Sequence, residues 1–89
     1  METKSELMPL NCSQKSFYGK AYFIDTDDNK TILYSYNTPI LEYDKDKQTI
    51  FDYDNYKDSN TTRKHIREFA RQRGYNFYVK DFEHYFIKL

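Results

Sequence analysis

Short runs of apolar and aromatic residues, separated by polar turns, dominate the first half of the chain. They lie at 15–25 (KSFYGKAYFID), 31–36 (TILYSY), 40–43 (ILEY) and 49–53 (TIFDY). Runs of this length, rich in aromatic and β-branched residues and bounded by Asp and Asn, predict β-strands. Because the connections are short, we expect the four strands to form an antiparallel meander. Pro39 lacks an N–H, so it is expected at an edge, at a bulge or at the start of the third strand.

The pattern changes to a helical period over residues 60–73. Ser59 or Asn60 is a suitable N-cap, and Gly74 lies where a left-handed C-cap residue is favoured. Between these ends a narrow stripe at positions i, i+3, i+4 and i+7 is formed by Ile66, Phe69, Ala70 and the aliphatic part of Arg73. We expect the helix to lie across one face of the sheet and to pack by this stripe alone.

The segment after Gly74, YNFYVKDFEHYFIKL, is predicted to be β, as one long strand or as two short strands around residues 80–81. A short helix over 81–87 is the alternative. Residues 1–14 show neither period and are predicted to be a flexible N-terminal arm. Residues 15–89 are expected to be a single domain, since so short a chain cannot support two cores. The predicted fold class is therefore α+β, an antiparallel sheet of about four strands plus a C-terminal β segment, with one helix packed on it.

Composition indicates how the core is built and which cellular compartment the protein occupies. Of the 89 residues, 19% are Phe or Tyr, so aromatic rings must build the core and also remain on the surface, where tyrosine favours interfaces. A single cysteine, Cys12, excludes an intramolecular disulfide and fits a reducing compartment. Neither a signal peptide nor an apolar run of about 18 residues is present. These features predict a cytoplasmic protein that does not contact a membrane.

The chain is neutral overall because two oppositely charged segments cancel. Residues 25–58 hold four bases and nine acids, a net charge of −5, while residues 59–74 hold five bases and one acid, a net charge of +4. The flanking segments, 1–24 and 75–89, have net charges of +1 and 0. Helical spacing places four of the bases on one face, which we expect to be an exposed basic ridge: Arg63, Lys64, Arg67 and Arg71.

Three interpretations of this charge remain open. The helix could pair with nearby acids as an ordinary charged surface, which contributes about 0 to 1 kcal/mol per pair. The basic ridge could instead contact phosphates while exposed tyrosines stack on bases. In the third interpretation, spaced carboxylates imitate phosphates and tyrosines bury area against a protein partner. The residues predicted to bind that partner are Asp25, Asp27, Asp28, Glu42, Asp44, Asp46, Asp52, Tyr53, Asp54, Tyr56 and Asp58.

The sequence offers little that is typical of an enzyme or of a metal site. His65 and His84 have no third ligand at coordinating spacing, so both are expected to be structural. The acids at 25–28 are not a calcium loop, because Lys30 and Tyr36 occupy the positions that need Gly and Glu. Neither a phosphate-binding glycine loop nor a nucleophile motif accompanies the carboxylates. We therefore predict no catalytic residue, no metal and no cofactor.

Three stretches resemble a known family. These are KSFYGKAY, the S-Y-N-T of Ser35–Thr38 and the T-T-R-x-H-I-x-E-F of Thr61–Phe69, and together they are similar to a family of small proteins encoded by phages and prophages of Firmicutes. The resemblance implies a β-meander followed by a helix, a viral accessory role and no known enzyme activity.

In type, the chain also looks like anti-CRISPR inhibitors. We therefore expect a non-enzymatic inhibitor that binds a bacterial immune effector, such as a CRISPR–Cas component, in the host cytoplasm. The alternative is a small accessory protein that binds nucleic acid through the basic helix 60–73. An open sheet edge could also pair two copies as a homodimer.

Overall fold

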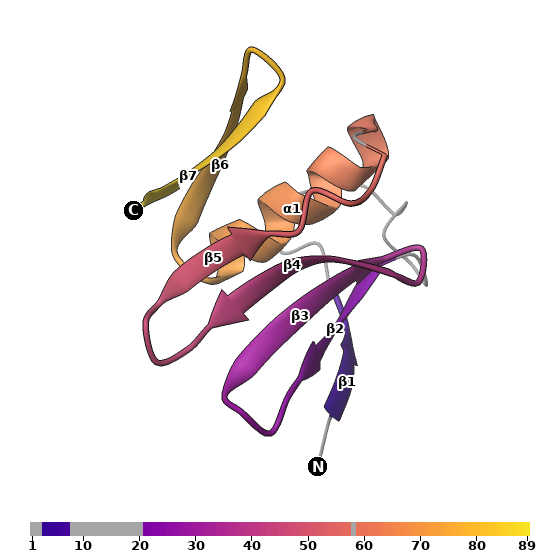
Figure 1. The fold of residues 1–89 in the computed structure, drawn as a ribbon, viewed down its shortest axis with the longest axis vertical. Helices are drawn as coiled ribbons and strands as arrows, with labels where there is room; N and C mark the ends of the chain where they lie inside the picture. Colours follow the sequence, from indigo (N-terminus) through magenta and orange to yellow (C-terminus); the bar gives the residue numbers. More distant parts are fainter. Residues whose placement is uncertain (1–2, 8–20, 58) are drawn as a thin grey trace.

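The computed structural model describes residues 3–7, 21–57 and 59–89 (Figure 1). The main sheet is antiparallel, has the order β1-β2-β3-β4-β5, and is followed by one helix and a separate two-stranded hairpin. The elements are β1 (Thr3–Glu6), β2 (Ala21–Asp25), β3 (Lys30–Ser35), β4 (Thr38–Asp44), β5 (Thr49–Asp52), α1 (Asn60–Gln72), β6 (Tyr75–Lys80) and β7 (Glu83–Lys88). The predicted α+β fold, with its meander and single helix, is confirmed.

Part of the expected N-terminal arm is a strand. Residues 3–6 pair with β2, from Thr3 opposite Asp25 to Glu6 opposite Tyr22. Leu7 follows; its N–H donates to the carbonyl of Ala21 at 3.0 Å, and its side chain is buried. The sequence TKSE contains no hydrophobic alternation, so backbone pairing at a sheet edge had no signal in the pattern. Residues 8–14 of the arm and 15–20 of the first predicted strand lie outside the described residues.

Pro39 lies at an irregularity of the β3–β4 pair. Leu33 faces Leu41, but the next residue of β3, Tyr34, faces Pro39, so Ile40 is an extra residue in β4. A bulge removes one ladder position and so accommodates a residue without an N–H. Pro39 is therefore found at one of the positions expected of it.

Helix α1 begins and ends where the sequence predicts. Ser59 caps it, with its Oγ accepting from the N–H of Thr62 at 3.2 Å, and Gly74 follows it with φ +86°. The stripe faces the sheet, and the rings of Phe69 and Phe23 lie 6.2 Å apart. The buried hydrophobic side chains are Leu7, Ala21, Leu33, Ile40, Leu41, Ile66, Phe69, Ala70, Tyr75 and Phe77.

The C-terminal segment folds as a hairpin of its own, so that α1 lies between the main sheet and β6–β7 (Figure 1). Phe77 is buried, and its ring lies 5.3 Å from that of Phe86. A two-stranded hairpin is marginal in water, so packing of this kind stabilises it. The helix therefore packs on two sides, and the expectation that it packs by one thin stripe is wrong. Within the described residues, no helix has the length and apolar character needed to cross a membrane.

Candidate functional site

The face of the main sheet opposite the helix is rich in aromatic and aliphatic side chains. Strand register aligns Tyr22 with Tyr34 along one line and Ile24, Ile32, Glu42 and Phe51 along another. Because residues opposite one another in a ladder share a face, these positions lie on the side away from Phe23 and the helix. Within the described chain, helix and hairpin both pack elsewhere. We name this surface the open face and define its apolar patch as Tyr22, Ile24, Ile32, Tyr34, Phe51 and Tyr53.

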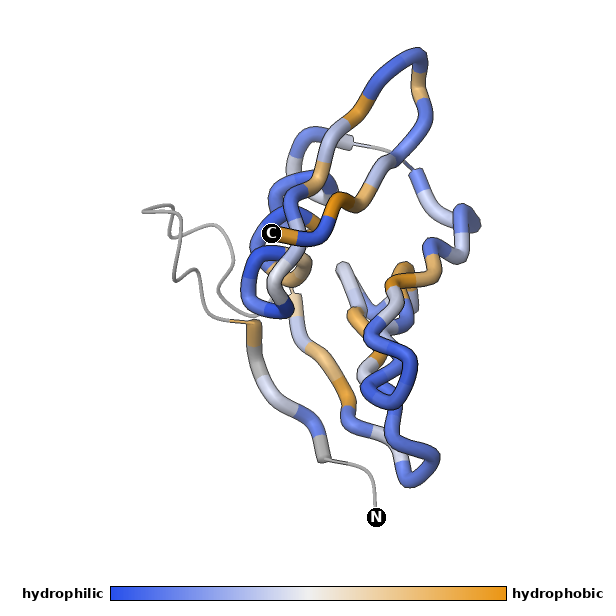
Figure 2. Tube along the Cα trace, turned by 90° about the vertical axis from the view of Figure 1, so that its left-hand side faces the viewer, coloured by the Kyte–Doolittle hydropathy of each residue, from blue (hydrophilic) through white to orange (hydrophobic). Residues whose placement is uncertain are grey.

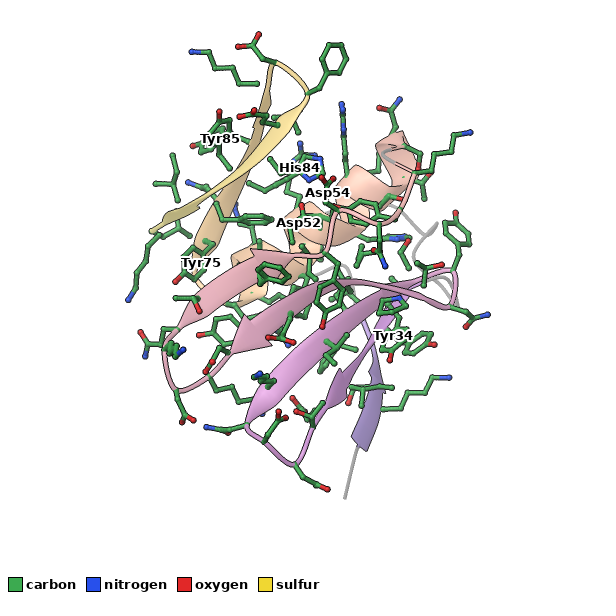
Figure 3. All side chains as sticks on the ribbon, in the orientation of Figure 1. Tyr34, Asp52, Asp54, Tyr75, His84 and Tyr85 are labelled. Atoms are coloured by element: carbon green, nitrogen blue, oxygen red, sulfur yellow. The ribbon has the colours of Figure 1, made fainter. Side chains whose placement is uncertain are left out.

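A stacked pair of tyrosines lies at one side of the open face. The rings of Tyr22 and Tyr34, the latter labelled in Figure 3, have centroids 4.9 Å apart and an interplanar angle of 6°. The Lys4 Nζ lies 4.2 Å from the centroid of Tyr22, and the Tyr22 hydroxyl donates to Asn37 Oδ1 at 3.2 Å. These contacts hold the two rings in fixed positions. A partner that binds the rings therefore costs little additional side-chain entropy.

A second aromatic pair lies at the other side of the open face. Phe51 is 61% exposed, and its ring meets that of Tyr53 at 5.7 Å in an edge contact. The Tyr53 hydroxyl donates to Glu42 Oε1 at 2.9 Å. Burial and the Glu42 carboxylate raise the pKa of Tyr53 to about 12. Lys30 Nζ lies 3.5 Å from Glu42 Oε2, and the negative charge of that carboxylate raises the pKa of Lys30.

Five of the predicted partner-binding acids lie around two turns at one end of the sheet. The turns lie side by side, because Asn29 Nδ2 donates to Asp46 Oδ1 at 2.5 Å and the N–H of Lys45 donates to the carbonyl of Asn29 at 3.1 Å. Figure 2 shows them as neighbouring hydrophilic bends at its lower right. Asp27, Asp28 and Asp46 are exposed, whereas Asp25 and Asp44 are half-buried.

Two of these five acids stabilise the turns themselves. Asp44 Oδ1 accepts from the N–H of Asp46 at 3.0 Å and from that of Lys47 at 3.1 Å. Asp25 accepts from Thr31 Oγ1 at 2.7 Å and lies 3.0 Å from Lys45 Nζ. The bond from Thr31, with Lys45, holds the pKa of Asp25 below its usual value. Both acids are therefore structural as well as charged.

Asp52 belongs to a network that joins the main sheet to the hairpin (Figure 3). His84 Nδ1 lies 2.6 Å from Asp52 Oδ2, and because a carboxylate only accepts, Nδ1 carries the hydrogen. The Tyr56 hydroxyl donates to the same carboxylate at 2.8 Å and 2.9 Å. The His84 ring also meets Phe77 edge-on at 5.1 Å. The side chains of His84 and Asp52 are 8% and 17% exposed, so this is an internal network.

An open depression of about 540 Å³ lies beside this network, lined by Asp52, Asp54, Phe82, Glu83 and His84. Asp54 is exposed, and Asp58 lies outside the described residues. The predicted acidic surface is thus divided between the two turns, Glu42 on the open face, and the region around Asp52. The pairing of Asp52 with His84 was not predicted; the residues are 32 positions apart, and neither spacing nor motif connects them.

The basic face of α1 is partly covered. Arg67 and Arg71 are exposed, whereas Arg63 and Lys64 are half-buried. The Arg67 guanidinium lies 5.9 Å from the Phe77 ring, and Arg71 Nε donates to Asn76 Oδ1 at 3.2 Å, so both contact β6. The hairpin therefore occupies part of the surface that the sequence predicts to be a free basic ridge.

The fifth base of the helical segment packs inside. The Arg73 guanidinium lies 4.0 Å from the Phe69 ring and 4.8 Å from the Phe23 ring, as the predicted stripe requires. Burial lowers the pKa of Arg73, while the nearby Asp25 opposes that shift. Arg73 is therefore half-buried against the core rings, an inward position that the helical period alone could reveal.

His65 is also buried, with its Nδ1 2.8 Å from Ser35 Oγ and its ring 5.8 Å from that of Tyr36. His65 therefore lies inside the fold, between the helix and the end of β3. Within residues 3–7, 21–57 and 59–89, no group of three or more His, Cys, Asp or Glu side chains is arranged to hold a metal ion.

Comparisons with known proteins place the chain in a family. Neither the curated proteins nor the solved structures contain a significant match. The sequence profile of a family of unknown function, DUF8033, matches residues 5–84, a span that runs from β1 into β7. Because this match covers most of the chain, the protein belongs to the DUF8033 family.

Proposed function

We propose that this protein is a non-catalytic binding protein that engages a protein partner through the open face and its acidic margin. The observation that carries the proposal is the pre-ordered apolar patch, in which a stacked tyrosine pair and the 61% exposed Phe51 share one uncovered side of the described sheet. Phe51 is exposed and the other five patch residues are half-buried. Apolar patches rimmed by polar groups are typical of interaction surfaces.

The charges around the patch favour a partner with a basic surface. Glu42 lies among the patch residues, and the exposed acids Asp28 and Asp46 lie at the turn end of the same sheet. Lys30 offsets part of this charge, since it lies 3.7 Å from Asp28 and 3.5 Å from Glu42. Carboxylates next to tyrosine suit a surface rich in Arg and Lys, such as the nucleic-acid channel of an effector. We therefore propose inhibition of a bacterial defence effector, for example a CRISPR–Cas component in a phage-infected cell, as the biological role.

One observation favours nucleic acid as the second candidate partner. Tyr22 and Tyr34 with Lys4 combine a flat aromatic surface with a cation, and base stacking on an aromatic ring contributes about 1 to 3 kcal/mol per base. The neighbouring acids would repel a polyanion. In addition, Arg67 and Arg71 already contact the hairpin. We therefore rank this candidate below a protein partner.

The test is capture of partners from a bacterial host lysate by the tagged full chain, with and without nuclease. Phe51→Thr and Tyr34→Thr remove patch rings but keep strand propensity. Tyr85→Thr makes the same kind of change on the hairpin and is the matched control. The proposal expects a nuclease-resistant protein that Phe51→Thr and Tyr34→Thr lose and Tyr85→Thr retains.

A charge variant completes the test. Asp27→Asn with Asp46→Asn should weaken capture and reduce its salt dependence, because exposed charges act over a screened distance of about 10 Å at 0.1 M salt. Recovery of nuclease-sensitive nucleic acid alone would support the second candidate instead. Equal capture by the parent and the patch variants would overturn the assignment of the open face.

A further inference from the structure

Exposed apolar side chains concentrate on the hairpin. Seven large hydrophobic side chains are exposed within the described residues, and five of them lie in the last fifteen positions. The five are Tyr78 (51% exposed), Phe82 (93%), Tyr85 (43%), Ile87 (56%) and Leu89 (69%). This concentration is unusual in a chain whose mean hydropathy is −1.01.

Strand register places Tyr78, Tyr85 and Ile87 on the side of the hairpin away from the helix, while Phe82 in the turn and Leu89 after β7 lie at its two ends. Tyr78 faces Tyr85, and Ile87 faces Asn76, in the pairs that alternate with Phe77–Phe86. Phe77 and Phe86 pack against the core, so Tyr78, Tyr85 and Ile87 point outward, as Tyr85 does in Figure 3, while Asn76 lies at the margin, where its Oδ1 accepts from Arg71 Nε. The Tyr85 hydroxyl donates to Glu83 Oε2 at 2.8 Å, which satisfies its polar end and leaves the ring exposed. We call this surface the outer face of the hairpin.

The turn presents a further ring. Asp81 and Phe82 form the two-residue connection between Lys80 and Glu83, with φ of 53° and 64°. Left-handed backbone at both positions is the geometry that Asn-Gly and Asp-Gly favour, and it is costly for a bulky residue. Phe82 nevertheless holds this conformation and is 93% exposed.

We propose that the outer face is the interface of a two-fold symmetric homodimer. The face has no charge preference, because Lys80 and Glu83 lie opposite each other and residues 75–89 carry two bases and two acids. A strongly charged partner therefore gains no electrostatic attraction at this face. A second copy of the face, which also has no net charge, meets no electrostatic repulsion. Closed two-fold dimers bury the same surface on both copies.

The available area agrees with such an interface. With about 200 Å² for each fully exposed side chain of this size, the five residues offer on the order of 600 Å² per copy. Standard interfaces bury about 800 Å² per partner, and the polar atoms between these side chains would add to the apolar part. If the two hairpins pack face to face with reversed strand directions, the Phe82 end of one lies over the Ile87 end of the other.

This surface is separate from the open face, so the homodimer stands or falls independently of the proposed function. The test is sedimentation equilibrium of the full chain from micromolar to millimolar concentration. The parent should pass from 10.9 kDa to twice that mass. Tyr85→Thr and Ile87→Thr, which keep strand propensity, should each shift the dissociation constant at least tenfold upward. Phe51→Thr, which removes an exposed ring from the main sheet, should leave it unchanged.

A measurement on the parent protein removes any dependence on how the variants fold. On dilution, the amide resonances of 75–89 should move, while those of β2 and β3 stay fixed. A parent that remains monomeric at millimolar concentration would overturn the proposal. A dimer that survives both hairpin substitutions, or dilution shifts confined to other elements, would also overturn it.

Discussion

His84 in β7 and Asp52 at the end of β5 are joined by a 2.6 Å contact between Nδ1 and Oδ2, although they belong to different sheets. Tyr56 donates to the same carboxylate. At the other end of the hairpin, Lys88 Nζ donates to Gln48 Oε1 at 3.1 Å, and the Tyr75 hydroxyl donates to the carbonyl of Gln48. Among the described residues, side-chain bonds such as these connect the hairpin to the sheet that precedes the helix.

Asp52 should stabilise this connection between the sheet and the hairpin. Asp52→Asn keeps the shape but removes the charge that accepts from His84 and Tyr56, so it should lower the free energy of unfolding by about 1.5 to 3 kcal/mol. Urea unfolding followed by circular dichroism measures the change. Asp54→Asn, the same substitution at an exposed neighbour, should stay within about 0.5 kcal/mol. Equal effects of the two would show that the network does not stabilise the fold.

Acid should weaken the fold partly through Asp25. The bond from Thr31 and the neighbouring Lys45 lower the pKa of this carboxyl in the folded state. A lowered folded pKa gives stability that is present above the unfolded value of about 3.9 and is lost as pH falls through the folded pKa. Asp25→Asn should therefore flatten the loss of stability below about pH 4. Urea titrations between neutral and acidic pH measure the free energy of unfolding of the parent and of Asp25→Asn, with Asp27→Asn as control. If the parent and Asp25→Asn lose the same stability below about pH 4, the prediction is wrong.

Tyr53 should dominate the behaviour in alkali. Its pKa is raised from 10.0 to about 12 by burial and by Glu42. A raised folded pKa gives stability that is present below the unfolded value and is lost as pH rises through the folded one, here from about 10 to about 12. Nuclear magnetic resonance of labelled tyrosine rings should show Tyr53 titrating near pH 12, and Glu42→Gln should lower its midpoint. A midpoint of Tyr53 near pH 10 would contradict the geometry.

Phe82→Gly should stabilise the monomer while weakening association. Glycine adopts the positive φ of the turn without strain. Removing the Cβ clash should therefore raise the free energy of unfolding of the monomer by about 1 kcal/mol. The same change removes the most exposed ring of the hairpin, at the turn end of the outer face. The melting temperature measured at low protein concentration should therefore rise. The dissociation constant of the dimer should rise as well, because association is weaker. A lower melting temperature at low concentration would show that the turn stores no strain.

Gly74→Ala isolates the cost of one backbone conformation. The φ of Gly74 is +86°, and a Cβ built there meets nothing within 4 Å, so the cost is conformational and not steric. We expect a loss of about 1 to 2 kcal/mol, and a smaller one for Gly74→Asn, since Asn tolerates left-handed backbone. Urea unfolding measures both variants. Equal losses for Ala and Asn would point to a different cause.

Local patterns predicted most of the elements. The helix was predictable because its signals are adjacent: the cap at Ser59, the stripe with Phe69, and Gly74 after the last turn. Four strands followed from short aromatic runs between turns. Strand β1 was not predicted, because its four residues, TKSE, are held by backbone pairing with β2 and not by a hydrophobic face. The separation of the hairpin from the main sheet had no sequence signal either.

Surface chemistry was less predictable than the fold. The candidate acids were recognised by type, but their grouping depends on which turns lie side by side, as Asn29 and Asp46 show. Asp52 was expected at a partner surface, and instead it accepts from Tyr56 and pairs with His84. The basic face was recognised by its helical spacing. Its partial cover by β6 followed only from where the hairpin packs.

By itself, the sequence determined the α+β class, the ends of the helix and the inward position of Arg73, because propensity, capping and periodicity act over a few residues. The tertiary structure decided which side of the sheet the helix and the hairpin leave open among the described residues, which acids are internal, and that the C-terminal residues form a second sheet. These outcomes depend on contacts between residues far apart in the chain, such as Asp52 and His84, which differ by 32 positions. Their energy arises only when separate elements pack, and a pattern read along one segment does not contain it.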